Sequence, residues 1–188
     1  MLKQIPNMLT FSRIVIIPFL VASFYINYFF PEADARLAHW VAAGLFGLAS
    51  LTDFFDGYLA RALKVESNLG KLLDPIADKL IVATAIILLV HFDRANIIAS
   101  LIILCREIAI SGLREFLAQT NISVPVTNLA KIKTSFQMLA IFLLILGTKG
   151  TGEELTKDLG NICLWIAAML TLVTGYAYVK AGMRHVVD

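Results

Sequence analysis

The sequence predicts an all-α, polytopic membrane protein with six transmembrane helices and a short N-terminal interfacial segment. Of its 188 residues, 59% are hydrophobic and only 16% are charged, whereas soluble domains are roughly half apolar and a quarter charged. The apolar residues gather in long stretches. The breaks between these stretches are short and carry the glycine, proline and charged residues that are typical of turns.

Each apolar stretch approaches the roughly 20 residues that a helix needs to cross a bilayer. The six spans are expected at residues 8–30, 37–60, 72–92, 97–117, 132–147 and 159–179. Residues 5–10 are expected to form the interfacial segment, with Asn7 as a helix N-cap. Arg13, Pro18 and the length of the first apolar run argue against a cleaved signal peptide. We therefore expect residues 1–188 to form a single membrane domain.

The lysines and arginines predict the orientation of these spans. With the N-terminus placed on one side of the membrane, twelve of the 16 basic residues fall on that side. The four on the other side are Arg36, Arg94, Lys149 and Lys157. Since basic residues accumulate on the cytoplasmic side, both termini and the second and fourth connections are expected to face the cytoplasm.

Other features of the composition exclude some classes of protein. The net charge is only +2, and no basic tract with interleaved aromatic residues indicates nucleic-acid binding. Cys105 and Cys163 lie in apolar stretches, so we expect buried hydrophobic side chains and no disulfide. His39, His91 and His185 are expected to be loop or terminal residues without a catalytic role.

Four aspartates lie at the cytoplasmic ends of the second and third predicted spans. They are Asp53, Asp56, Asp74 and Asp78. An ionised carboxylate within a membrane helix costs up to about 3 kcal/mol, so a cluster of four needs a cation. The members of each pair are three or four residues apart and share a helix face, and all four converge if the two helices pair antiparallel. Pro75 leaves open whether Asp74 is an N-cap or a mid-helix residue.

The chemistry around these aspartates indicates a site for divalent metal and phosphate. Carboxylates without nearby His or Cys favour Mg²⁺ or Mn²⁺, and two such ions roughly 3.5–4 Å apart suit phosphoryl transfer. Gly57 and Ala60 share the acidic face and leave room for a nucleotide, while Arg61 offers a fork of phosphate donors. Alternatively, the carboxylates are solvated at the helix ends and paired with Arg61, Lys71 and Lys79, which leaves the two small residues unexplained.

The spacing of this motif resembles the signature of the CDP-alcohol phosphatidyltransferase family. The matching positions are Asp53, Asp56, Gly57, Ala60, Arg61, Gly70, Asp74 and Asp78. Residues 5–13, 106–115 and 131–134 resemble segments of the members that use sn-glycerol 3-phosphate, so the likeness covers nearly the whole chain. The resemblance implies transfer of the phosphatidyl group from CDP-diacylglycerol to sn-glycerol 3-phosphate, with release of CMP, in phospholipid biosynthesis.

The resemblance also implies roles for individual residues. Asp53, Asp56 and Asp74 are expected to hold two metal ions, and Asp78 to complete the metal site and act as general base. The CDP-lipid is expected to contact Asn7, Thr10, Arg13, Gly57, Ala60, Arg61 and Gly70. A homodimer in membrane lipid is expected, located in the bacterial inner (cytoplasmic) membrane with its active site facing the cytoplasm.

The predicted acceptor site is a group of four cations at the cytoplasmic ends of the fourth and fifth spans. They are Arg106, Arg114, Lys131 and Lys133. A dianionic substrate such as sn-glycerol 3-phosphate needs such a group. In other interpretations the arginines pair with Glu107 and Glu115, and the lysines hold anionic lipid headgroups.

Other functions remain open from the sequence. The same chemistry serves other acceptors, namely inositol phosphate, serine or phosphatidylglycerol, although four cations favour a phosphorylated one. A divalent-cation transporter also carries acids in its membrane helices, but here the acids gather at one membrane face and no comparable acids continue across. A non-catalytic lipid-binding module would not need the complete set of aspartates.

Overall fold

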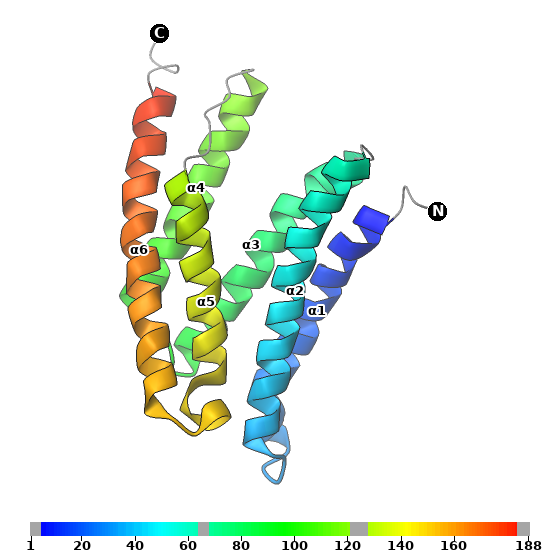
Figure 1. Cartoon of the computed structure of the whole chain (residues 1–188), viewed down its shortest axis with the longest axis vertical. Helices are drawn as coiled ribbons and strands as arrows, with labels where there is room; N and C mark the ends of the chain where they lie inside the picture. The colour runs from blue at the N-terminus through cyan, green and yellow to red at the C-terminus, as the bar shows by residue number, and fades with distance from the viewer. Residues whose placement is uncertain (1–4, 64–67, 121–127, 184–188) are drawn as a thin grey trace.

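A computed structural model describes residues 5–63, 68–120 and 128–183, with the side chains of residues 5–10, 53–63, 68–72, 128 and 148 left out of the description. This part of the chain holds six helices and no strand. They are α1 (Ile5–Phe29), α2 (Ala35–Leu63), α3 (Asn68–His91), α4 (Ile97–Gln119), α5 (Asn128–Thr151) and α6 (Glu154–Met183). In Figure 1, α1 and α2 lie on one side, α5 and α6 on the other, and α3 crosses between them towards α4.

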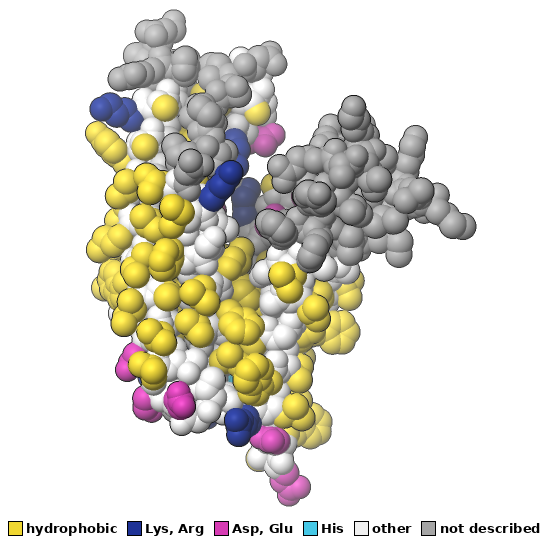
Figure 2. All heavy atoms as spheres, viewed as in Figure 1, with side chains coloured by type: hydrophobic (Ala, Val, Ile, Leu, Met, Phe, Trp, Pro, Cys, Tyr) yellow, Lys and Arg dark blue, Asp and Glu magenta, His cyan; other side chains and the backbone are white. Residues whose placement is uncertain are grey.

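The surface of the described residues is that of a helical membrane protein. Three helices are long and apolar enough to cross a bilayer, over Phe11–Phe29, Leu129–Gly147 and Glu154–Met183. Large apolar side chains are exposed along these helices and also along α2 and α4. Figure 2 shows hydrophobic side chains over the middle of the visible face and acidic side chains at its lower end. An exposed apolar band of this size needs lipid or another protein to cover it.

One expectation about helix boundaries is wrong, and one question that the sequence left open is answered. The first helix already begins at Ile5, so residues 5–10 are part of α1 and Asn7 lies inside the helix; Pro6 does not interrupt it, because proline is tolerated in a first turn. The third helix begins at Asn68, so Asp74 is a mid-helix residue followed by an internal Pro75. The N-cap interpretation of Asp74 is thereby excluded.

Two single residues also differ from expectation. His39 lies in α2 and is buried, because its turn of the helix packs under the end of α5. Cys105 and Cys163 are free thiols as expected, but Cys105 is exposed on a face of α4 that no described helix covers.

The apolar stretch that was expected to end at residue 147 does end there, since Gly147 has a non-helical φ of 50° and ψ of −166° within α5.

Small side chains let the helices approach closely. Alanines fill much of the core, and the larger core side chains, among them Phe46, Ile86, Leu144 and Leu164, interdigitate between them. Helices α5 and α6 form the most extensive helix pair. Within this pair Gly160 of α6 lies directly against Leu144 of α5. Small residues at such contacts are the usual means of packing membrane helices.

We expect Gly160→Ala to destabilise the protein. A Cβ at this position would lie 2.8 Å from Leu144 Cγ and 3.2 Å from the Leu144 backbone nitrogen, so the two helices must separate. Such overpacking typically costs about 1–3 kcal/mol, which outweighs the roughly 1 kcal/mol that alanine gains in helix propensity. The measurement is the thermal unfolding midpoint of the purified protein in detergent, which should fall.

The matched control is Gly44→Ala in α2. A Cβ at Gly44 meets no atom within 4 Å in the described residues, so only the gain in helix propensity remains. Its unfolding midpoint should stay the same or rise slightly. Equal midpoints for the two variants would show that the contact between α5 and α6 tolerates an added methyl group.

Candidate functional site

The two halves of the aspartate motif lie at the same end of the molecule. The end of α2 and the beginning of α3 meet at the upper end in Figure 1. The α2 backbone is helical from Ala35 to Leu63, so positions 53, 56, 57 and 60 follow the helical spacing that places them on one face. Eight predicted site residues have no described side chain or Cα environment. They are Asn7, Thr10, Asp53, Asp56, Gly57, Ala60, Arg61 and Gly70.

Arg13 joins α1 to the acidic face of α3. Its guanidinium donates to Asp78 and, over 3.3 Å from Nη2 to Oδ1, to Asp74. Arg13 is only 1% exposed, whereas the side chains of Asp74 and Asp78 are 43% and 35% exposed. The arginine is thus an internal partner, whereas both carboxylates remain partly accessible to solvent. The structure therefore brings one predicted CDP-lipid residue into contact with two predicted metal-site residues.

The donor chemistry of Asp74 and Asp78 fits a hard divalent cation. Both offer carboxylate oxygens from successive turns of α3, and these are the ligands that Mg²⁺ and Mn²⁺ prefer. Among the described residues, no group of three His, Cys, Asp or Glu side chains is close enough to hold an ion. The side chains of Asp53 and Asp56 are not among the described ones, so the four-carboxylate site stays a prediction.

A second polar cluster joins α4, α5 and α6. Glu107 of α4 accepts hydrogen bonds from Lys133 of α5 and, at 3.3 Å, from its neighbour Arg106. Arg106 also donates to the Thr174 hydroxyl of α6 at 3.0 Å. A Cβ at Gly175 would lie 3.1 Å from Arg106 Cγ, so the glycine lets the arginine cross close to α6. Two of the four predicted acceptor residues are therefore held together around one carboxylate.

The other two predicted acceptor residues lie nearer the surface. The guanidinium of Arg114 stacks over the Tyr178 ring, 5.7 Å from its centroid, and its positive charge still acts on Lys133. Lys131 is exposed on α5. Figure 2 shows basic side chains gathered towards the upper end of the molecule, beside a hollow in its surface. Arg106, Arg114 and Lys133 thus form one positively charged region, and Lys131 lies on its outer side.

The role of Glu107 was missed by sequence reasoning, which treated it only as a neighbour of Arg106. The available signal was its position within an apolar helix, because a carboxylate there needs a cation from another helix. Thr174 was also missed, since a threonine in an apolar helix gives no such signal. Both residues fix the orientation of the predicted acceptor cations.

Comparison with known proteins decides the family. The family model of the CDP-alcohol phosphatidyltransferases matches residues 3–173. The chain belongs to this family. The resemblance inferred from the aspartate motif is therefore confirmed, and so is the prediction that the protein is a transferase. The match includes every position of the predicted metal and nucleotide sites, and it extends through the helices that carry the four predicted acceptor residues.

Individual relatives are similar over almost their whole length. A protein from Rickettsia felis is 51% identical over 183 residues, covering 97% of each chain. A protein from Bacillus subtilis is 38% identical, covering 93% of each chain, and one from Cereibacter sphaeroides is 38% identical, covering 98% of each chain. All three are named CDP-diacylglycerol–glycerol-3-phosphate 3-phosphatidyltransferase.

Proposed function

We propose that the protein transfers the phosphatidyl group of CDP-diacylglycerol to sn-glycerol 3-phosphate, giving phosphatidylglycerophosphate and CMP. The observation that carries the proposal is the full-length similarity to relatives named for this reaction. The aspartate motif and the separate cluster of cations supply the two kinds of group that the reaction needs. One neutralises a pyrophosphate, and the other binds the phosphate of the acceptor.

In this proposal the aspartates organise the reacting groups. Asp53, Asp56, Asp74 and Asp78 hold two divalent ions, Mg²⁺ or Mn²⁺, which supply charge neutralisation for the pyrophosphate and the leaving CMP. Asp78 takes the proton of the acceptor hydroxyl, whose oxygen forms a bond to the lipid-side phosphorus. The bond from that phosphorus to the bridging oxygen breaks, and CMP leaves. Arg13 fixes the orientation of Asp78 through the contact between α1 and α3.

The CDP-lipid lies against the helix ends that carry the motif. Gly57, Ala60 and Gly70 leave space for the nucleotide, and Arg61 binds a phosphate with its fork of donors. Asn7, Thr10 and Arg13 approach from α1. The close contact of α1 with both α2 and α3 supports this arrangement, since it places the first helix beside both halves of the motif.

The acceptor phosphate binds at the cluster of cations. Arg106, Arg114, Lys131 and Lys133 carry four positive charges, of which Glu107 balances one. A phosphate dianion therefore enters a region with surplus positive charge. This balance favours a phosphorylated acceptor over serine, which would place its own ammonium group beside the same cations.

The proposed arrangement in the membrane follows from the distribution of all lysines and arginines between the two ends of the molecule. We propose that all six helices span the bilayer, with the aspartates and the acceptor cations at its cytoplasmic face in the bacterial inner membrane. Helix α4 carries two of the acceptor arginines together with their acidic neighbours. The exposed apolar side chains of α3 and α4 offer a surface for a homodimer.

The function is tested by offering the purified protein a panel of acceptors together with CDP-diacylglycerol and measuring CMP release. We expect sn-glycerol 3-phosphate to be used best, and serine, inositol phosphate, phosphatidylglycerol and glycerol to be poor acceptors. Preferred use of any other acceptor would keep the family assignment and refute this choice of substrate. Metal uptake into proteoliposomes without CDP-lipid tests the transporter alternative and should be absent.

Lys133→Ala should impair use of the acceptor selectively. Removing one charge-assisted hydrogen bond to phosphate costs about 1.5–3 kcal/mol, or roughly ten- to a hundredfold in kcat/KM for sn-glycerol 3-phosphate. The KM for CDP-diacylglycerol and the Mg²⁺ requirement should stay close to those of the unchanged protein. Discrimination between glycerol 3-phosphate and glycerol should decrease. Steady-state kinetics with each substrate varied in turn measure all of these.

Lys157→Ala is the control, because it removes the same charge near the opposite end of the molecule. It should leave the kinetics of both substrates unchanged. Since Lys133 is only 5% exposed and paired with Glu107, the unfolding midpoint of each variant is measured in parallel. If Lys133→Ala changed only the KM for CDP-diacylglycerol, the four cations would be assigned to binding of the lipid or the nucleotide.

A further inference from the structure

A cavity of about 220 Å³ opens at the end of the molecule opposite the aspartates. It lies between the end of α1, the beginning of α2, the connection from α3 to α4, and the last turn of α5. Phe24, Tyr28 and Phe92 form an aromatic part of its wall, and His39, Arg94 and Lys149 form a polar part. In the orientation predicted from the basic residues, this end faces away from the cytoplasm.

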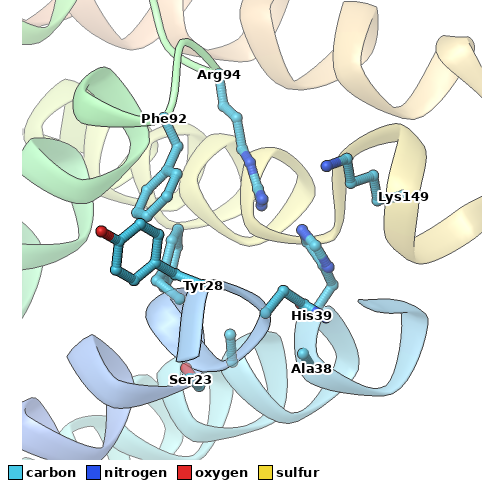
Figure 3. Close-up of a pocket in the computed structure, with 10 residues that line it drawn as sticks. Ser23, Tyr28, Ala38, His39, Phe92, Arg94 and Lys149 are labelled. Atoms are coloured by element: carbon cyan, nitrogen blue, oxygen red, sulfur yellow. The ribbon is translucent and has the colours of Figure 1, made fainter. Parts of the chain in front are cut away.

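The polar part of the wall is positively charged and lacks a balancing acid. Figure 3 shows the Arg94 guanidinium, the His39 ring and the Lys149 amine directed towards one another. Arg94 and Lys149 both act on His39 through their positive charge. None of the ten residues that line the cavity, all of them described, is acidic. Like charges held this close repel one another unless an anion lies between them.

Arg94 is held in place by neutral partners. It donates to the Ile145 carbonyl at 3.1 Å, and its guanidinium lies 5.4 Å from the centroid of Phe24 and 5.9 Å from that of Phe92. Burial lowers the pKa of Arg94, because the surrounding side chains remove water from its charge. A bound anion would offset this loss of solvation.

His39 presents a buried polar atom to the same cavity. Its Nδ1 donates to the Ala35 carbonyl, because a carbonyl oxygen can only accept. Its Nε2 is buried and has no partner among the described residues, although the residue is only 7% exposed. A second proton on the ring makes Nε2 a donor, and a neighbouring anion favours that protonated form.

The backbone beside Lys149 is anchored by a kink and two hydrogen bonds. Gly147 turns the last residues of α5 away from the helix axis with a φ of 50°. The Gly150 carbonyl then accepts from Arg36 Nε at 3.2 Å and from Trp40 Nε1 at 3.1 Å, both on α2. These contacts hold the residue that carries the Lys149 side chain at the edge of the cavity.

We infer that this cavity binds a phosphate group on the face of the protein opposite the aspartates. Two cations, Arg94 and Lys149, and a buried imidazole supply the donors that a phosphate needs, and the volume holds a phosphate with a few attached atoms. The aromatic wall suits the apolar part of a phosphate ester. The phosphate belongs either to the headgroup of an anionic phospholipid or to free inorganic phosphate. This site is separate from the one proposed for the acceptor.

The test measures binding to the purified full chain in a neutral detergent. Phosphatidylglycerol, phosphatidylcholine and inorganic phosphate are titrated separately, and bound ligand is counted by native mass spectrometry alongside the unfolding midpoint. We expect Lys149→Gln to weaken binding of phosphatidylglycerol or of inorganic phosphate about tenfold. Lys157→Gln removes the same charge near the same end without lining the cavity, and should bind like the unchanged protein.

The outcomes separate the two sources of phosphate. If Lys149→Gln weakens binding of phosphatidylglycerol alone, the site is assigned to a lipid headgroup. If the variant also weakens binding of inorganic phosphate, the site is assigned to the phosphate group itself. His39→Gln, which keeps a polar side chain, should show the same loss. Equal binding by the unchanged protein, Lys149→Gln and Lys157→Gln would overturn the proposal. CMP release close to that of the unchanged protein verifies that each variant is folded.

Discussion

Asp53→Asn, Asp56→Asn and Asp74→Asn are each expected to reduce CMP release by at least two orders of magnitude at low Mg²⁺. In the proposed site each change removes one anionic ligand that two ions share, so it should weaken the binding of both. The charge stabilisation that bound metal gives to phosphoryl transfer amounts to several kcal/mol, which corresponds to such a loss in rate. The measurement is CMP release as a function of Mg²⁺ and Mn²⁺ concentration, with partial recovery expected at high metal concentration.

The structure provides a control for this loss. Asp93→Asn makes the same chemical change at the opposite end of the molecule, where the residue has a φ of 54° that asparagine tolerates. It should retain full activity and the normal metal requirement. Near-normal turnover at low Mg²⁺ by any of the three motif variants would remove that aspartate from the set of ligands.

The unfolding midpoint of Asp74→Asn separates a lost ligand from a lost fold. Asp74 contacts Arg13 at 3.3 Å, but its side chain is 43% exposed, and Arg13 also contacts Asp78. Water still reaches the Asp74 carboxylate, and the contact between Arg13 and Asp78 is kept, so we expect the unfolding midpoint of the variant to fall much less than its activity. A loss of activity without a large change in midpoint then reflects the site.

The helices were predictable from the sequence because each one contains a long apolar stretch, and three of them are long and apolar enough to cross a bilayer over their described residues. The six predicted spans each coincide with a helix of the described chain, and most differences are at the ends. Asp74 illustrates why the ends differ. Pro75 is compatible with either the first turn of a helix or a kinked interior, and only the position of the preceding turn decides between them.

The spacing of the aspartates predicted the family, but local patterns could not show which helices meet. The contact between Arg13 and the α3 aspartates joins residues 65 and 61 positions apart. Similarly, Glu107 meets Lys133 only because α4 and α5 both pack beside α6. Sequence spacing fixes the face of one helix, whereas the partner across a helix interface depends on the packing of all six.

The cationic cavity was missed for the same reason. His39, Arg94 and Lys149 belong to three separate segments, and each alone is an ordinary residue near the end of a helix. His39 was expected to be a loop or terminal residue, although it lies near the beginning of the predicted span 37–60. The early start of α2 and the kink at Gly147 place it beneath the end of α5.

The second large effect is expected for Asp78→Asn, which should lose the chemical step and retain substrate binding. A general base matters mainly in the transition state, so its removal typically lowers kcat by about 10²–10⁴ and changes KM little. Equilibrium binding of CDP-diacylglycerol in the presence of Mg²⁺, measured beside steady-state kinetics, distinguishes these effects. A defect in KM alone would contradict the role of base.

Arg13 offers a separate test of how Asp78 is positioned. Arg13→Lys keeps the positive charge but loses the planar fork of donors that reaches both carboxylates of α3. If Arg13 acts through Asp78, the variant should show a smaller defect of the same kind, in kcat. If it acts on the nucleotide, the KM for CDP-diacylglycerol should rise while kcat is retained. Because Arg13 is almost fully buried, the unfolding midpoint of Arg13→Lys is compared with that of Asp78→Asn, in which the contact between Arg13 and Asp74 is kept.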